Sequence, residues 1–214
     1  MYDEIRSWHT DALLARTAEN LSRRGFAAHI KQTREEIQAH LGSLIPAGAS
    51  VGVGGSVTVR DLGLTGMLAG RGCAVLDHWR DGLSKEEVHE IRRRQLTADF
   101  FLTSANAITL DGRLVNIDGT GNRVAAMSFG PRHVIVVAGA NKIARDLDDA
   151  LWRVRNVASP MNCRRLGLKT PCSVAGRCGE CGKETTVCRI VSIIEYKPTA
   201  ADYTVILTPL ELGF

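Results

Sequence analysis

Residues 99–142 decide the fold, and they read DFFLTSANAITLDGRLVNIDGTGNRVAAMSFGPRHVIVVAGANK. The apolar runs at residues 100–102 and 134–138 are short, rich in β-branched or aromatic side chains, and bounded by turn residues. This pattern is typical of strands buried in a parallel sheet. Each run is followed by small polar residues, which should therefore lie at the carboxyl end of a strand. In open α/β sheets, ligands bind at that edge.

Strands and helices alternate with short connections through residues 26–158, which predicts a mostly parallel, doubly wound α/β sheet. Residues 1–25 form a separate unit, an amphipathic N-terminal helix that packs on this domain. A Cys-rich segment at residues 159–189 follows the core, and Pro160 predicts that the preceding helix ends near Val157. Residues 190–214 contain two strands, which we expect to return to the core as a terminal hairpin.

A second hairpin is predicted inside the α/β array. Residues 107–110 and 113–117 alternate in polarity and flank Asp111 and Gly112, a pair that favours a tight turn. The two ends of this hairpin are Asn106 and Asp118, which should therefore be neighbours in space.

The composition excludes several classes of protein. The chain has 214 residues and a net charge of +4, with 27 basic residues interleaved among 23 acidic ones. No basic stripe of the kind that tracks nucleic acid is present, and the run from Arg92 to Arg94 is interpreted as a solvated, ion-paired helix face. No apolar stretch has the length of a membrane span, and the N-terminus lacks a signal-peptide pattern. We therefore expect a cytoplasmic protein without nucleic-acid partners.

The loops after the predicted strands have the composition of an anion-binding site. A strand at residues 50–53 runs into Gly54, Gly55 and Ser56, where glycine lets the backbone approach a ligand closely. Neither a dinucleotide fingerprint nor a phosphate-binding P-loop is present. Asp118 and Lys142 are the candidates for acid–base chemistry in such a pocket. Asp118 could instead anchor the hairpin, and Lys142 could instead be a surface charge.

Five of the six cysteines lie between residues 163 and 188, and Cys73 stands apart. We predict one metal centre whose ligands are Cys172, Cys178, Cys181 and Cys188. Thiolates select zinc or iron–sulfur clusters. The Cys178-Gly-Glu-Cys181 knuckle suits zinc, whereas the uneven spacing favours a 4Fe–4S cluster, and Cys163 is a possible replacement ligand.

Five motifs in order resemble those of the LUD-domain lactate-utilisation family of the LutC/YkgG type. They begin at Gly54, Leu62, Thr103, Asp118 and Gly139, and the resemblance extends to the closing residues 212–214. It implies a fold of the NagB/RpiA/CoA-transferase-like type, whose loops bind phosphorylated sugars or acyl-CoA. It also implies a role in the oxidation of L-lactate, alongside iron–sulfur partner subunits.

The motifs and the loop composition together give a set of predicted anion-binding residues: Gly54, Gly55, Ser56, Thr58, Asn106, Thr109, Asn122, Arg123 and Asn141. Arg123 is the expected cation, because its planar fork can hold a carboxylate bidentately.

Three functions are consistent with these features. The first is a component of an iron–sulfur redox system that acts on L-lactate or a related small organic acid. The second is a non-redox isomerase or CoA-transferase-like enzyme, and the third is a non-catalytic regulatory or assembly subunit. The sequence leaves the oligomeric state open, with a homo-oligomer possible.

Overall fold

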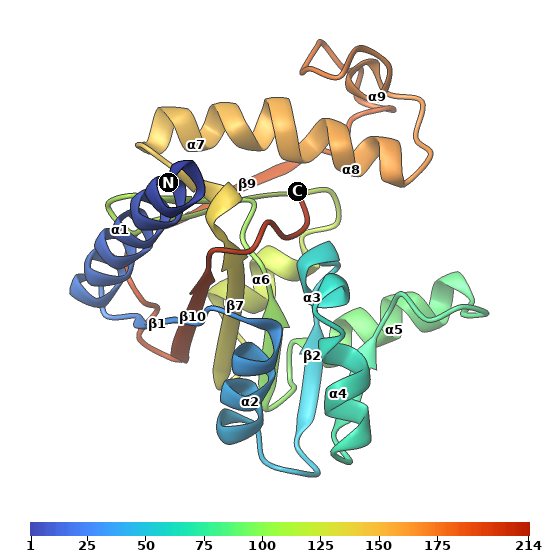
Figure 1. Ribbon diagram of the computed structural model, residues 1–214. Coiled ribbons are helices and arrows are strands. Elements are labelled where there is room, and N and C mark those ends of the chain that lie inside the picture. Colours follow the sequence, from blue (N-terminus) through green and yellow to red (C-terminus); the bar gives the residue numbers. More distant parts are fainter.

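The computed structural model describes all 214 residues and contains a six-stranded, wholly parallel sheet with helices on both faces (Figure 1). The strands lie in the order β1 (Ala27–Ile30), β10 (Asp202–Thr208), β7 (His133–Gly139), β4 (Phe100–Thr103), β2 (Ser50–Val53) and β3 (Ala74–Asp77). This arrangement confirms the predicted α/β fold with a mostly parallel central sheet.

The side chains of each strand point alternately to the two faces of the main sheet, and this divides the core into two layers. In β7, Val134 and Val136 belong to one buried cluster, whereas Ile135 and Val137 belong to the other. Successive side chains of a strand point to opposite faces of the sheet, and both faces are buried here. The first layer lies under α1 (Tyr2–Arg23) and α6 (Asn122–Ser128), and the second under α2 (Arg34–Leu44), α3 (Val57–Asp61) and α4 (Leu64–Gly70). Helix α5 (Lys85–Gln95) packs beside β2 and β3.

A smaller sheet stands beside the main one. Its strands lie in the order β8 (Ile143–Ala144), β5 (Ala107–Thr109), β6 (Leu114–Asp118) and β9 (Ile190–Ile194). Strands β5 and β6 are antiparallel, with Ala107 opposite Val115, so the predicted internal hairpin is confirmed. Gly112 has a φ of +89° in the connecting turn, a conformation that glycine adopts without strain.

The predicted C-terminal hairpin is wrong, because β9 and β10 join different sheets. Strand β9 is antiparallel to β6 at the edge of the small sheet, and β10 lies parallel between β1 and β7. The two strands differ in how deeply their side chains are buried, and this explains their separation. Residues Tyr203, Val205, Ile206 and Leu207 of β10 are all buried, so this strand needs cover on both faces, whereas most of β9 is exposed or half-buried.

One nearly continuous helical rod lies across the carboxyl edge of the main sheet (Figure 1). It consists of α7 (Leu147–Arg153), a π-helical turn at Val154–Ala158, and α8 (Ser159–Arg165). The predicted helix end near Val157 is therefore wrong. Pro160 lies in the first turn of α8, where its missing N–H group is tolerated, and the wider π turn directly precedes it. A short helix, α9 (Pro171–Ala175), follows.

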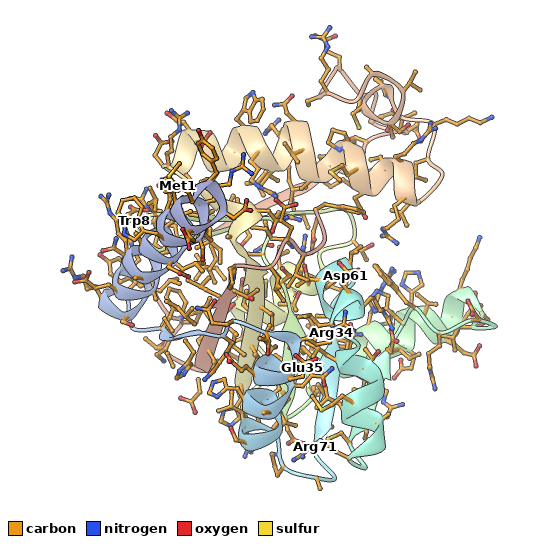
Figure 2. All side chains as sticks on the ribbon, viewed as in Figure 1. Met1, Trp8, Arg34, Glu35, Asp61 and Arg71 are labelled. Atoms are coloured by element: carbon orange, nitrogen blue, oxygen red, sulfur yellow. The ribbon has the colours of Figure 1, made fainter.

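Helix α1 is the longest in the chain and is amphipathic, as predicted. Leu14 and Leu21 are buried in the core, and Trp8 is 68% exposed and points away from the sheet (Figure 2). No helix of the protein combines the length and the apolar character that a bilayer crossing requires.

The C-terminal residues fold back over the loops at the carboxyl edge. The amide of Gly213 donates to Asp61 Oδ2 at 2.9 Å, and the hydroxyl of Thr58 donates to the carbonyl of Leu212 at 3.3 Å. The backbone carbonyl of Asp61 also accepts a bond from Arg34 Nη2 at 2.7 Å, which ties α3 to α2 (Figure 2). These contacts hold the tail against the loop that follows β2.

Gly139, at the end of β7, provides a test of this packing. A methyl group there would collide with the backbone carbonyl of Leu210 and approach Asn141 Oδ1, so no side chain fits while the tail is in place. We expect Gly139→Ala to lower the free energy of unfolding by about 1–3 kcal/mol in urea titrations.

Gly66 is the matched control. It is exposed in α4, and nothing lies within 4 Å of an added methyl group. We expect Gly66→Ala to leave stability unchanged or to raise it by about 0.5–1 kcal/mol. Equal effects of the two substitutions would contradict the packing of the tail on Gly139.

Candidate functional site

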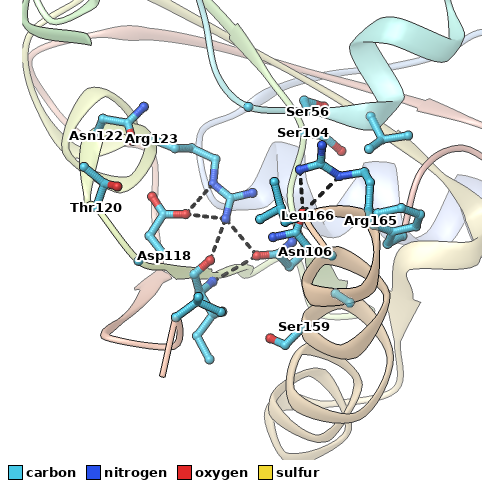
Figure 3. Close-up of a pocket in the computed structure, with 18 of the residues that line it drawn as sticks. Ser56, Ser104, Asn106, Asp118, Thr120, Asn122, Arg123, Ser159, Arg165 and Leu166 are labelled. Atoms are coloured by element: carbon cyan, nitrogen blue, oxygen red, sulfur yellow. Dashed lines mark hydrogen bonds and ion pairs between the residues drawn. The ribbon is translucent and has the colours of Figure 1, made fainter. Parts of the chain in front are cut away.

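A cavity of about 280 Å³ lies at the carboxyl edge of the main sheet, between the strand ends and helix α8 (Figure 3). The loop after β2 contributes Gly55 and Ser56, and the loop after β4 contributes Ser104 and Asn106. The small sheet supplies Asp118 from the end of β6. The remaining walls come from α5, α6, α8, Lys142 after β7, and the C-terminal residue. Segments distant in the sequence thus meet at one crevice, as expected for a sheet of this kind.

The cavity is lined by more positive than negative groups. Its four cationic side chains are Arg92, Arg123, Lys142 and Arg165, and Asp118 is its only acidic side chain. Asp118 is already neutralised by a salt bridge to Arg123. The other three cations make no salt bridge within the protein, so the cavity carries an excess of positive charge that attracts anions.

Lys142 lies at the centre of this arrangement. It is 3% exposed, and its Nζ donates to the hydroxyl oxygens of Thr58 at 2.8 Å and Ser104 at 2.9 Å. These partners follow β2 and β4, and Lys142 itself follows β7. The amine therefore joins the loops of three different strands.

The charge state of Lys142 is unusual. The pKa of its amine is lowered from 10.5 to about 7, mainly by burial and then by the nearby cations Arg153 and Arg123, whereas Asp61 acts in the opposite direction. A buried ammonium group that is not paired with a carboxylate is costly, so part of the population loses its proton near neutral pH. The amine and ammonium forms of Lys142 are therefore both accessible at pH 7.

Arg123 and Asp118 form a closed network with Asn106 (Figure 3). Arg123 Nε donates to Asp118 Oδ1 at 2.9 Å, and Nη2 donates to Asn106 Oδ1 at 2.9 Å. Asp118 Oδ2 accepts the amide of Val124 at 3.1 Å. The side of the guanidinium that carries Nε and Nη2 is thus engaged by the protein itself. Asp118 anchors the end of the hairpin, the alternative role considered from the sequence.

Arg92 is the cavity residue that the sequence analysis misassigned. The interpretation of residues 92–94 as a solvated, ion-paired face is correct for Arg93, which pairs with Glu90 at 3.8 Å and is 77% exposed. It is wrong for Arg92, which lines the cavity and makes no salt bridge. Arg92 Nε is buried without a hydrogen-bond partner. The side chain donates no hydrogen bond within the protein, so the remaining nitrogens of its guanidinium are available to a ligand in the cavity.

The wall opposite Asp118 contains an arginine stacked on an aromatic ring, which sequence reasoning also missed. The guanidinium of Arg165 lies 4.4 Å from the ring centroid of Trp79, and its Nη2 donates to Asn162 Oδ1 at 2.7 Å. A methyl group at Gly55 would lie 3.0 Å from the same ring, so glycine permits this close approach. No motif signals this contact, because it joins the loop after β3 to a helix more than eighty residues later.

His78, which follows β3, also lines the cavity. It is buried, and its Nδ1 lies 3.0 Å from Gln95 Nε2. Burial lowers the pKa of its imidazole to about 4, and Arg92 and Arg60 act in the same direction. His78 is therefore neutral at pH 7.

The site residues predicted from the sequence fall into two groups. Seven line the cavity: Gly55, Ser56, Asn106, Asp118, Asn122, Arg123 and Lys142. Four lie behind it: Gly54, Thr58, Thr109 and Asn141. Thr58 holds Lys142, the hydroxyl of Thr109 bonds to Asp111 within the hairpin turn, and Asn141 exchanges hydrogen bonds with Leu212. Gly54 packs against Thr103, where a side chain would collide with the hydroxyl.

The cysteines gather beside this cavity. Cys163 is buried on α8, and Cys172 is buried on α9, where it contacts the hydroxyl of Thr170 at 3.2 Å. Burial raises the pKa of the Cys163 thiol to about 11, and its neighbour Cys172 contributes to that rise. The thiol of Cys188 lies 3.4 Å from the hydroxyl of Ser159, a residue of the cavity wall. The Cys-rich segment thus adjoins the cavity directly.

The thiols do not form a closed coordination shell in this structure. No three His, Cys, Asp or Glu side chains are close enough together to hold a metal ion. Cys178 is exposed and Cys181 is half-buried, in a loop without regular structure between α9 and β9. The donor chemistry nevertheless suits a thiolate-bound metal, since four of these side chains belong to one short segment.

Comparison with known proteins supports both the fold and the family. Residues 14–208 match the sequence profile of the LUD domain. The structure is similar to the crystal structure of a DUF162-family protein from Deinococcus radiodurans, with a TM-score of 0.51 over 93% of this chain and 98% of that chain. The two sequences are 16% identical, so this likeness concerns the fold alone. No curated protein matches the chain.

The Arg123–Asp118 pair provides a test of the geometry. Both side chains are about nine-tenths buried, so removal of the guanidinium leaves a buried carboxylate without a counter-ion. We expect Arg123→Met to lower the free energy of unfolding by about 3–5 kcal/mol, and the Asp118→Asn/Arg123→Met double variant to recover part of that loss.

Arg93→Met is the control for this experiment, because Arg93 belongs to an exposed pair and should change stability by no more than about 0.5 kcal/mol. Chemical denaturation of the unmodified protein, Asp118→Asn, Arg123→Met and the double variant gives the double-mutant cycle. Strictly additive effects at positions 118 and 123 would show that the pair is not coupled.

Proposed function

Because this chain belongs to the LUD-domain family, as its loop motifs predicted, we propose that it is a component of a redox system for L-lactate or a related small organic acid. The acid binds in the cavity at the carboxyl edge of the main sheet. The observation that carries this proposal is the excess of positive charge there: three cations without a carboxylate partner.

The cavity suits a small carboxylate in size and in chemistry. Its volume of about 280 Å³ is at the lower end of ligand sites. Arg92 offers a guanidinium that makes no salt bridge, and Lys142 offers a head group that is accessible as amine and as ammonium. Ser56 and Ser104 supply hydroxyl groups at the same surface, which suit the hydroxyl or carbonyl oxygen of the acid.

The Cys-rich segment supports the redox part of the proposal. Cys172, Cys178, Cys181 and Cys188 would hold the metal centre, and Cys163, buried beside Cys172, is a further candidate ligand. A 4Fe–4S cluster, favoured over zinc, would supply one-electron transfer. The contact between Cys188 and Ser159 supports this assignment, because it sets the thiols against the wall of the cavity. Iron–sulfur partner subunits are the proposed further carriers.

A non-redox enzyme of the isomerase or CoA-transferase type is the second candidate. Lys142 favours it, because a buried amine with a pKa of about 7 can act as a base. Asp118, the other predicted acid–base group, is less suited to that role because both of its carboxylate oxygens accept hydrogen bonds from the protein. Stabilisation by CoA esters or sugar phosphates would distinguish this candidate.

Ligand binding can be measured by calorimetry and thermal shift with L-lactate, pyruvate, a sugar phosphate and a CoA ester. We expect the small carboxylates to bind and to raise the melting temperature. Arg92→Met should weaken that binding about 10- to 100-fold, the effect of losing one hydrogen bond to a charged group. Arg93→Met, the neighbouring exposed arginine, should bind as the unmodified protein does. If only the CoA ester or the sugar phosphate binds, the lactate proposal is wrong.

Metal content tests the role of the cysteines. We expect anaerobically purified protein to contain iron and sulfide, and Cys172→Ser to lose them while the sheet stays folded. Cys73→Ser is the control, because Cys73 is the one cysteine outside the segment and its thiol faces the carbonyl of Pro46. One zinc per chain without iron would remove the electron-transfer role, and equal metal content in both variants would contradict the ligand assignment.

A further inference from the structure

We propose that Lys142 is a nucleophile that binds the carbonyl carbon of a 2-oxo acid, forming a reversible imine in the cavity. The inference rests on the proposed function, because it requires that a small organic acid occupies this site. It goes further by assigning a covalent step to one atom, Lys142 Nζ. Pyruvate, the 2-oxo acid that corresponds to L-lactate, is the simplest ligand of this class.

The geometry around Nζ is that of an amine held for reaction. Lys142 is buried on the wall of the cavity, and its two hydrogen-bond partners are the hydroxyls of Thr58 and Ser104 rather than carboxylates. A lysine that serves only as a cation is normally paired with an acid, because an isolated buried charge is expensive. The Thr58 hydroxyl donates to the carbonyl of Leu212 and the Ser104 hydroxyl to that of Ala105, so both oxygens accept from Lys142 Nζ. A neutral amine can satisfy both with its two N–H groups while its lone pair stays free.

Charges that face Lys142 from neighbouring elements favour the neutral form. Arg123 on α6 and Arg153 on α7 disfavour the ammonium, and Asp61 on α3 opposes them only in part. The pKa of about 7 makes a substantial fraction of Lys142 a free amine at neutral pH, whereas an exposed lysine is almost fully protonated there. Nucleophilic lysines in proteins are activated by desolvation and adjacent cations in this manner.

The step is balanced without an oxidant or a reductant. The Nζ lone pair forms a bond to C2 of the 2-oxo acid, and a proton passes from nitrogen to the former carbonyl oxygen, giving a carbinolamine. That oxygen then leaves as water after it receives a second proton, and a C=N bond replaces the C=O bond. Both protons come from the two N–H groups of the amine, and Ser104, which lines the cavity and contacts the nitrogen, is placed to pass them. Arg92 can hold the carboxylate, since it lines the cavity and makes no salt bridge within the protein.

A purely structural role for Lys142 is the competing explanation. The amine would then only tie Thr58 to Ser104, and a desolvated ammonium would be an expensive way to join two hydroxyls. A purely electrostatic role, in which the ammonium contacts a ligand carboxylate, is a second alternative. Neither role makes a covalent bond, so a chemical trap separates them from the imine.

The experiment incubates the intact protein with pyruvate and sodium cyanoborohydride and maps the reduced adduct by peptide mass spectrometry. We expect the adduct on Lys142 and at most traces on the exposed lysines Lys85, Lys169 and Lys183. L-lactate has no keto group and should give no adduct. The yield should rise as the pH passes upward through about 7, where Lys142 becomes the free amine.

Two variants complete the design. Lys142→Met keeps an apolar stem of similar length and should abolish the adduct, and Ser104→Ala should slow its formation while Lys142 remains. An adduct spread evenly over the exposed lysines, or one that persists in Lys142→Met, would overturn the proposal. If a variant fails to fold, the peptide map of the unmodified protein decides on its own.

Calorimetry with L-lactate on the same preparation separates the two proposals. Binding of L-lactate without a Lys142 adduct from pyruvate would overturn the imine and leave the proposed function intact. Absence of both binding and adduct would overturn both. An adduct on Lys142 together with L-lactate binding would support both.

Discussion

The contact of Lys142 with the hydroxyls of Thr58 and Ser104 is the interaction on which the site depends. The three residues follow β7, β2 and β4, neighbouring strands in the middle of the sheet. Parallel pairing sets Thr103 opposite Val136 and Val53 opposite Leu102, so the carboxyl ends of these strands lie side by side. The amine then fixes the loops that follow them. The rest of the cavity is built around that point, with α8 above it and the C-terminal residues beside it.

The cavity carries an electrostatic cost in the absence of a ligand. Arg123 and Arg153 both act on Lys142, and Arg92 has a buried nitrogen without a partner. Like charges and unsatisfied donors of this kind lower stability, and proteins keep them at sites where a ligand removes the strain. A bound anion would pair with Arg92 and offset the repulsion among these cations. Affinity for anions and reduced stability of the empty protein thus have the same origin.

Much of the fold follows from local patterns in the sequence. The hairpin at Asp111 and Gly112 depends on residues a few positions apart, and it forms as predicted. The central position of β10 and the course of the rod through Pro160 depend on tertiary packing, which a local pattern does not contain. Arg92 shows the same limit. Ile91 and Gln95 are the buried residues of α5, and they fix how the helix is rotated about its axis. In that orientation Arg92 lines the cavity and Arg93 stays in solvent.

Helix α8 links the two unusual parts of the molecule. One of its faces supplies Ser159, Asn162 and Arg165 to the cavity, and the same helix carries Cys163 among the thiols. Ser159 belongs to both environments, because it lines the cavity and its hydroxyl contacts the thiol of Cys188. Helices are stiff over two turns, and α8 continues the rod that begins with α7. A rearrangement of the thiols therefore acts on the cavity wall through α8 alone. A rearrangement of the wall acts on the thiols through the same helix.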